Sequence, residues 1–210
     1  MKKTSKIIVL ILILSVLTAS LVLLSACNTH SNGSSQDKLV VGLECAYIPF
    51  NFTQQTDKNG AVKISNADGY ANGYDVLIAK RIADALGKEL VIVKTEWDSL
   101  VPGVSAGTLD LVIAGMSPTA ERRESIDFSE AYYESNLVIV VRKDGNYVNA
   151  QNLDDFNGAK IVAQQGTFHD KVLQEQAASH GITAGTPMAT FPEMTIALNA
   201  KTIDGYVAEE

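Results

Sequence analysis

Apolar runs alternate with amphipathic stretches along residues 38–210, and this alternation predicts strands and helices in turn. Residues 38–43 form an apolar, β-branched run that is typical of a buried strand. Similar runs predict further strands over residues 90–93, 109–114, 137–141, 160–163 and 203–207. Apolar residues at helical spacing predict helices over residues 73–86, 99–106, 168–178 and 192–200. Strands that alternate with helices indicate an α/β fold with mostly parallel sheets.

Two segments depart from this alternation. Thr119 is the expected N-cap of a short helix that carries Glu121 and Arg122. Residues 54–72 are polar and contain one Asn-Gly and one Asp-Gly turn signal, so we expect a surface excursion there. A hairpin near residues 62–64 is the expected form of that excursion.

The first 27 residues have the layout of an export signal. Three lysines precede an apolar run over residues 7–24, and small residues then lead to Cys27. This pattern resembles a bacterial lipobox, which implies a signal peptide over residues 1–26 and acylation of Cys27. Residues 27–37 would then be a lipidated polar tether that holds the protein on the outer face of the cell membrane. A plain transmembrane anchor is the alternative, because about 18 apolar residues can span a bilayer.

The charge and the reactive residues limit the possible functions. Removing residues 1–26 removes three of the 17 basic side chains and none of the 24 acidic ones, which leaves a formal net charge of −10. An acidic surface of this kind argues against a nucleic-acid partner. The three histidines have no Cys or His neighbour at metal spacing, and no nucleophile elbow or P-loop is present. We therefore expect neither a cofactor nor an enzymatic activity.

A weak internal repeat links two parts of the chain. Trp97 lies 13 residues before Asp110, and Phe191 lies 13 residues before Asp204. Each copy reads as a helix followed by a strand, which puts Gly115 and Glu209 just past equivalent strands. Ligands of open α/β sheets bind at that edge, so two similar lobes facing a cleft would follow. Chance similarity of two helix–strand units is the alternative.

A longer stretch resembles the amino-acid-binding, family 3 extracytoplasmic solute-binding proteins of ABC importers. The resemblance rests on residues 97–102 (WDSLVP), 107–123 (GTLDLVIAGMSPTAERR), 126–129 (IDFS) and Tyr132–Tyr133. It implies a two-lobed, periplasmic-binding-protein-like (type II) clamp, with lobe 1 over residues 38–141 and lobe 2 over residues 142–210. It also implies that a monomeric clamp closes on one free amino acid and delivers it to an ABC permease with its ATPase.

The resemblance implies partners for both charged groups of an amino acid. Arg122 would bind the α-carboxylate, because a guanidinium can make two parallel hydrogen bonds to it; a surface ion pair is its alternative role. Glu209 would bind the α-ammonium group. The remaining ligand-binding candidates of this kind are Gly115, Met116, Ser117, Gln165, Gly166 and Thr167. For Ser117 and Thr167, turn formation and helix capping are the alternatives.

Three further residues would contact the ligand's side chain. Glu44 offers a carboxylate, and Tyr47 and Trp97 resemble the aromatic pair that sandwiches the side chain in this family. Aromatic faces beside a carboxylate favour a cationic side chain, with glutamine as the next choice.

Two other functions remain open at this point. A cyclohexadienyl (prephenate or arogenate) dehydratase shares the clamp fold, and Glu44 or Glu209 could serve as its acid. A ligand-sensing receptor domain is the second. Members of the family continue beyond the second hinge crossing, so we expect this chain to lack the crossing and the C-terminal return. An exposed apolar sheet edge on lobe 1 and marginal stability should result.

Overall fold

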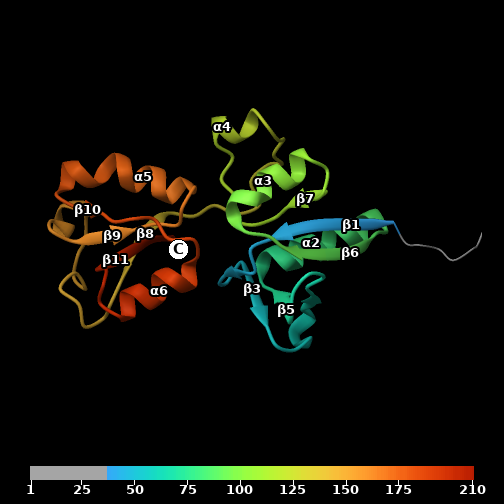
Figure 1. Ribbon diagram of the computed structural model, residues 1–210, viewed down its shortest axis with the longest axis horizontal. Coiled ribbons are helices and arrows are strands. Elements are labelled where there is room, and N and C mark those ends of the chain that lie inside the picture. The colour runs from blue at the N-terminus through green and yellow to red at the C-terminus, as the bar shows by residue number, and fades with distance from the viewer. Residues whose placement is uncertain (1–36) are drawn as a thin grey trace, which may run out of the picture. The chain divides into compact units, whose positions relative to one another are not determined.

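The computed structural model describes residues 37–210 (Figure 1). The expected signal peptide, Cys27 and the tether up to residue 36 lie outside the described residues. Among residues 37–210, none of the helices has the length and apolar character needed to span a bilayer.

A parallel three-stranded sheet forms the centre of the first lobe. Its strands are β1 (Lys38–Leu43), β6 (Glu89–Lys94) and β7 (Leu111–Val112), in the order β6-β1-β7. Alternate β1 residues pack on opposite faces: Val41 packs on the side of α2 (Tyr74–Leu86), and Val40 on the side of α3 (Trp97–Ser105). Helix α2 ends at Gly87 in the left-handed conformation, as the sequence predicts.

The polar excursion is part of a small antiparallel sheet. Its strands are ordered β2-β3-β5-β4, and β4 pairs with β5 to give the predicted hairpin. The 3-10 turn η1 (Lys58–Gly60) precedes β4. The bounds of the four strands are β2 (Ala46–Tyr47), β3 (Asn51–Gln54), β4 (Val62–Lys63) and β5 (Tyr70–Asn72).

The second lobe has a four-stranded sheet with one helix on each face (Figure 1). Helix α5 (Phe168–Gln176) packs with Ile161 and Val207, whereas α6 (Phe191–Asn199) packs with Val162 and Tyr206. Two 3-10 turns, η2 (Leu153–Phe156) and η3 (Ala177–His180), complete the α5 side. The strand order is β10 (Thr183–Ala184), β9 (Lys160–Val162), β11 (Gly205–Glu209) and β8 (Leu137–Val141).

The lobe boundary and one strand differ from the prediction. The predicted boundary after residue 141 assigned β8 to lobe 1, but β8 pairs antiparallel with β11 along its whole length. The first lobe therefore ends before Leu137, because the chain has crossed to the second sheet by then. The strand predicted over residues 109–114 is shorter than expected, since only Leu111–Val112 pairs with β1.

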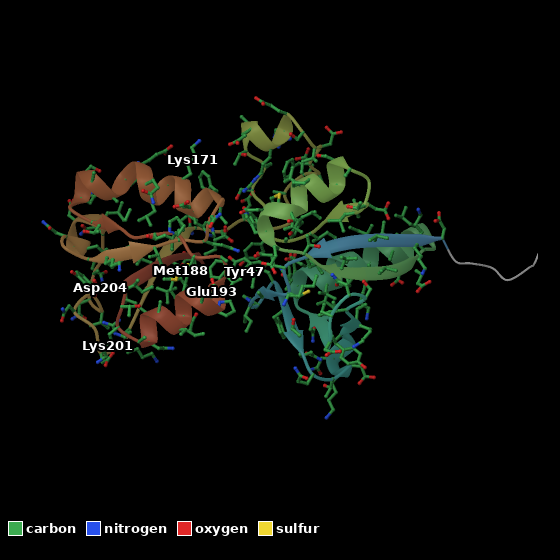
Figure 2. The ribbon with its side chains drawn as sticks, in the orientation of Figure 1. Tyr47, Lys171, Met188, Glu193, Lys201 and Asp204 are labelled. Carbon is green, nitrogen blue, oxygen red and sulfur yellow. The ribbon has the colours of Figure 1, made fainter. Side chains whose placement is uncertain are left out.

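The internal repeat is confirmed by matched contacts. Asp110 Oδ2 accepts a 2.8 Å hydrogen bond from the amide of Val40, and Asp204 Oδ2 accepts a 2.9 Å bond from the amide of Lys160. Each carboxylate thus ties its strand to the neighbouring strand in the same way. Figure 2 shows Asp204 at the end of the second lobe that lies away from Tyr47. The two aspartates fasten the strand starts and leave the opposite strand ends for the site.

An apolar groove runs beside β7. In the described part of the chain, β7 pairs on one edge only, with β1. The groove next to its other edge has a volume of about 770 Å³ and includes Ile78, Leu111 and Phe128 in its lining. The apolar sheet edge expected on lobe 1 is therefore present.

Candidate functional site

Side chains from both lobes gather at the carboxyl ends of β1 and β9 and around the loop after β7. They enclose a small pocket of about 10 Å³, which is room for roughly one water molecule. Its lining residues are Glu44, Tyr47, Trp97, Ala114, Gly115, Ser117, Arg122, Gln164, Thr167, Phe168, His169 and Phe191. Seven of the eleven predicted ligand-binding residues are among them: Glu44, Tyr47, Trp97, Gly115, Ser117, Arg122 and Thr167.

Direct contacts join the two sides of this pocket. The Trp97 indole donates to the carbonyl oxygen of Gly166 at 3.1 Å, and Arg122 Nη2 donates to the same oxygen at 3.1 Å. The rings of Tyr47 and Phe191 stack with their centroids 4.3 Å apart. Trp97 and Phe191, which occupy matching positions of the internal repeat, each begin a helix and each line the pocket.

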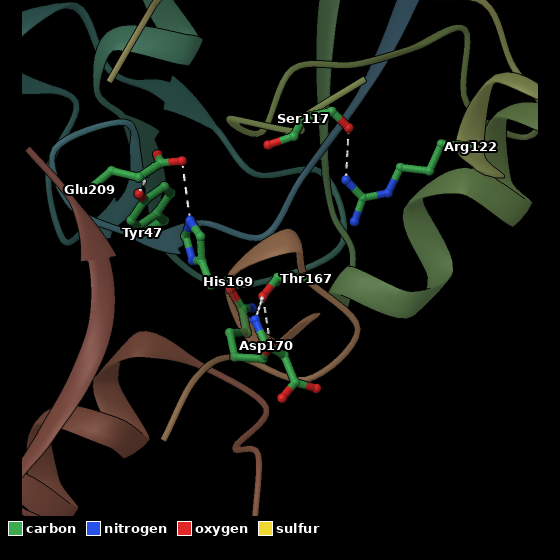
Figure 3. A network of polar contacts seen from close by, with 8 residues as sticks. Tyr47, Ser117, Arg122, Thr167, His169, Asp170 and Glu209 are labelled. Atoms are coloured by element: carbon green, nitrogen blue, oxygen red, sulfur yellow. Dashed lines mark hydrogen bonds and ion pairs between the residues drawn. The ribbon is translucent and has the colours of Figure 1, made fainter. Parts of the chain in front are cut away.

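Besides its bond to Gly166, Arg122 has contacts with three groups of the first lobe. Its Nη1 donates to the carbonyl oxygen of Ser117 at 2.8 Å (Figure 3), and its guanidinium lies 5.2 Å from the centre of the Trp97 ring. Thr119 caps α4 (Ala120–Arg123) by accepting from the Arg122 amide at 3.3 Å, as predicted. Burial lowers the pKa of Arg122, although Glu121 opposes this effect. The guanidinium keeps its charge and is oriented toward the pocket.

Glu44 follows β1 and is nearly inaccessible to solvent. Glu44 Oε1 accepts a hydrogen bond from Gln164 Nε2 at 2.6 Å. Burial raises the pKa of Glu44 to about 7, and the Gln164 bond offsets this only in part. A carboxyl group whose charge depends on pH near neutrality therefore lies at one end of the pocket.

Glu209 ends β11 and interacts with the side chains of Tyr47, His169 and Ser135. The Tyr47 hydroxyl donates to Oε2 at 2.9 Å, and His169 Nε2 lies 3.1 Å from Oε1 (Figure 3). Burial alone would raise the pKa of Glu209, but the bonds from His169 and Tyr47 outweigh it, so the pKa is lowered. A stable carboxylate therefore lies beside the pocket, through contacts with two of its lining residues.

The turn before α5 is built around Gly166 and Thr167. Gly166 has φ +68°, a left-handed conformation that favours glycine, and a Cβ there would lie 2.5 Å from Asp98 Oδ1. The Thr167 hydroxyl donates to the Gln164 carbonyl at 2.6 Å and accepts from the Asp170 amide at 3.2 Å (Figure 3). The predicted capping role of Thr167 is thus confirmed.

Comparison with known proteins identifies the family. Residues 39–201 match the profile of the bacterial extracellular solute-binding proteins, family 3. The chain belongs to this family.

Relatives of the family 3 chain include proteins named for arginine. The arginine-binding extracellular protein ArtP of Bacillus subtilis (strain 168) is 31% identical over 160 residues, which are 75% of this chain and 56% of ArtP. The arginine-bound form of truncated ArgBP from T. maritima has a TM-score of 0.68 at 30% identity, covering 82% of this chain and 74% of that one.

A third relative bears on the enzyme alternative. The ancestral amino acid-binding protein AncCDT-1, a precursor of cyclohexadienyl dehydratase, has a TM-score of 0.70 at 28% identity, covering 82% of this chain and 70% of that chain. These neighbours confirm the predicted α/β, periplasmic-binding-protein-like fold. The chain spans about half the length of the curated relatives that it matches.

Some predicted residues of the family 3 site lie elsewhere. Met116 packs with Leu100 and Leu109 in the core of the first lobe and is absent from the pocket lining. The Gln165 side chain donates to Asp98 Oδ2 at 3.2 Å, also outside the lining. Gly166 contributes its carbonyl oxygen rather than a pocket-lining side chain.

Several residues that line the pocket were not predicted from the sequence, and His169 is the most informative of them. It is 7% exposed, and its Nδ1 has no hydrogen-bond partner among residues 37–210. The sequence of helix α5 is mostly polar, so the burial of His169 could not be predicted from it. Gln164 and Phe168 directly flank the predicted residues 165–167, and His169 follows Phe168. The predicted Gln-Gly-Thr segment was therefore the signal that could have identified Gln164, Phe168 and His169. Ala114 and Phe191 complete the missed set.

Across residues 37–210, no group of three or more His, Cys, Asp or Glu side chains is arranged to hold a metal ion.

Proposed function

We propose that this chain binds a free amino acid with a cationic side chain, such as arginine, outside the cell, and that the protein delivers it to an ABC import permease with its ATPase. The observation that carries the proposal is the presence of Arg122, Glu44 and Glu209 around one pocket between two lobes. The relatives named for arginine support it. We also propose that Cys27 is acylated and that the lipid anchors the protein on the outer face of the cell membrane.

Each ligand group has a proposed partner. The α-carboxylate would bind the guanidinium of Arg122 and the N-terminus of α5 beside Thr167. The α-ammonium group would bind Glu209, whose charge the Tyr47 and His169 bonds already stabilise. The cationic side chain would lie between Tyr47 and Trp97 and end at Glu44, which becomes charged as a cation approaches. Glutamine is the next candidate, because Glu44 can also accept from an amide.

Binding requires the two sides of the pocket to separate first. The pocket of about 10 Å³ is far too small for an amino acid. The Glu44–Gln164 bond and the two bonds to the Gly166 carbonyl would have to break on opening. The bond between the neutral Trp97 indole and the Gly166 carbonyl contributes a net of about 0.5–1.5 kcal/mol, and the bonds that involve a charged group contribute about 1.5–3 kcal/mol each. The ligand can replace most of them with bonds of its own.

A binding scan tests the proposal. Purified protein is titrated by calorimetry and thermal unfolding with the twenty amino acids, ornithine, cystine and prephenate. A ligand at 100 times its Kd stabilises a protein by about 2.7 kcal/mol. We expect such a shift with arginine, lysine or ornithine, and an affinity loss of about 100-fold in Arg122→Ala, as for a lost charge-assisted pair.

A neighbouring arginine provides the matched control. Arg123 belongs to the same short helix but lies over the ring of Phe128, away from the pocket lining. Arg123→Ala should change the affinity by less than about twofold. Equal losses in the two variants, or no shift with any amino acid, would contradict the proposal.

The dehydratase is the second candidate, favoured by one observation. Glu44 has a pKa of about 7 in a buried pocket, which suits a general acid, and AncCDT-1 is a precursor of such an enzyme. Stabilisation by prephenate, with conversion of prephenate that is lost in Glu44→Gln, would move the assignment to the enzyme.

A further inference from the structure

A second buried carboxylate, Asp75, lies outside the pocket and plays no part in the proposed ligand contacts. It stands in the first turn of α2, and its side chain is 0% exposed. Its own amide donates to the carbonyl oxygen of Phe50 at 2.8 Å. A carboxylate that is fully removed from water needs several hydrogen bonds to be tolerated.

Two side chains donate to Asp75. Asn51 Nδ2 donates to Oδ2 at 2.8 Å, and the Tyr132 hydroxyl donates to Oδ1 at 2.9 Å. The Asn51 and Tyr132 side chains each also accept a hydrogen bond from a backbone amide. Asn51 Oδ1 accepts from the Cys45 amide at 2.8 Å, and the Tyr132 oxygen accepts from the Gly115 amide at 3.1 Å. The five residues form one continuous chain of hydrogen bonds with Asp75 at its centre.

Both ends of this chain are segments that form the pocket. Cys45 directly follows Glu44 and has φ 56°, a left-handed conformation that is costly for a residue with a side chain. Gly115 lines the pocket and has φ 61°. Tyr132 belongs to the segment between α4 and β8, where the chain leaves the first lobe for the second sheet. Asp75 is thus connected to the Cys45 segment through Asn51, to the Gly115 segment through Tyr132, and to the Tyr132 segment directly.

We propose that Asp75 is a positioning residue for this pocket, which fixes the Glu44–Cys45 segment through Asn51 and the Gly115 segment through Tyr132. The effect on amino-acid affinity rests on the proposed function, whereas the positioning itself does not. The donor pattern requires a carboxylate, since Asp75 accepts from both partners. A protonated Asp75 would instead have to donate through one oxygen and would break this directional order.

The electrostatic surroundings make the network sensitive to pH. Burial raises the pKa of Asp75 to about 6, and the bonds from Asn51 and Tyr132 offset this only partly. Glu209 is a further titratable group near this cluster, and its charge raises the pKa of Asp75 further. Tyr132 and Tyr47 also lie there, and burial is the chief cause of their raised pKa values. Both tyrosines stay protonated throughout the range tested, whereas Glu44, which directly precedes Cys45 and has a pKa raised to about 7, also changes charge there. Glu44 is therefore replaced by glutamine in the test.

Amide NMR against pH tests the positioning without any ligand. The Gly115 and Cys45 amide shifts are followed from pH 4.5 to 8 in Glu44→Gln, which removes the neighbouring titration, and in the same variant with Tyr132→Phe added. In Glu44→Gln both amides should titrate together, with an apparent pKa near 6. In Tyr132→Phe the Gly115 titration should be lost while the Cys45 titration persists, because only one arm is cut. Asp75→Asn, where it folds, should abolish both.

The matched control is Tyr133→Phe, which changes the neighbouring, half-exposed ring and should leave both titrations intact. Arginine affinity gives the second readout: Tyr132→Phe should weaken it about tenfold, in keeping with a lost hydrogen bond, and Tyr133→Phe less than twofold. A Gly115 amide that is insensitive to pH, or that still titrates in Tyr132→Phe, would overturn the proposal. If no amino acid binds at all, the proposed function fails, and the two titrations still decide the positioning role.

Discussion

Two glutamates at opposite sides of the cleft show how the number of donors sets the charge of a buried carboxylate. Glu44 follows β1 and Glu209 ends β11, and both are largely removed from water. Glu44 has one amide donor and a pKa raised to about 7, whereas Glu209 has bonds from the Tyr47 phenol, the His169 imidazole and the Ser135 side chain and a lowered pKa. Burial acts in the same direction on both, so the donors decide the outcome.

The difference suits a ligand with two unequal cationic groups. Every amino acid carries an α-ammonium group, and Glu209 offers a charge that is always present. Only some amino acids carry a cationic side chain, and Glu44 offers a charge that a cation can induce. On the proposed function, Glu209 provides general affinity and Glu44 provides selectivity.

The largest expected effect is at Glu209. Glu209→Gln should weaken the binding of every amino acid about 100-fold, because a charge-assisted bond to the α-ammonium group is lost. Calorimetric titration with arginine and glutamine measures it. The control is Glu210→Gln, which alters an exposed neighbour that accepts from Asn136 at 3.0 Å and should change little. A loss confined to arginine would contradict the general role of Glu209.

Glu44 should show a selective effect and an opposite effect on stability. Glu44→Gln should weaken arginine about tenfold, as for a partly buried ion pair, and leave glutamine within twofold. Without added amino acid, the variant should be more stable than the original protein at pH 7.5, on the order of 1–3 kcal/mol, because a buried charge is removed. Chemical denaturation measures the difference. A variant that is less stable and equally weak for both ligands would refute the selective role.

The pH dependence of arginine binding should follow Glu44. Ionisation of Glu44 near pH 7 would make the affinity rise up to about tenfold between pH 6 and pH 8. Calorimetry in two buffers with different ionisation enthalpies should detect a proton released on binding. In Glu44→Gln the release near pH 7 should disappear. A release that persists in the variant would transfer the effect to another group.

The smallest effect concerns the donors of Glu209. Tyr47→Phe removes one donor and should cost about 1 kcal/mol of unfolding free energy at pH 7. Because the folded-state pKa of Glu209 is lowered, its contribution is present above its unfolded pKa and is lost as the pH falls through the folded value. The difference between variant and original protein should therefore shrink as the pH falls through the folded pKa of Glu209, which lies below the ordinary carboxyl value. Denaturation at pH 7 and pH 3.5 measures this, and a constant difference would indicate packing alone.

The sequence predicted those parts of the fold that local chemistry determines. The apolar run of β1, the Gly87 end of α2 and the Thr119 cap of α4 each depend on neighbouring residues only. The repeat with Asp110 and Asp204 was visible because spacing carries it. Strands β2 and β10 were not predicted, since two residues give no usable periodicity.

The site was predictable where a motif carried it and not where distant segments meet. Arg122, Glu44 and Glu209 were identified from the family resemblance, but the donors to the two glutamates were not. Gln164 and His169 reach Glu44 and Glu209 only when segments far apart in the sequence come together. The assignment of β8 failed for the same reason, because its partner β11 is the last strand of the described chain.

Trp97 gives this protein an intrinsic optical reporter. It is the single tryptophan of the sequence, its indole N–H is bonded to the Gly166 carbonyl on the far side of the pocket, and a guanidinium lies over its ring. Any separation of the two sides must break that bond and change the polarity around the indole. Its emission wavelength and its quenching by iodide should therefore follow opening and ligand capture in real time, with no label attached.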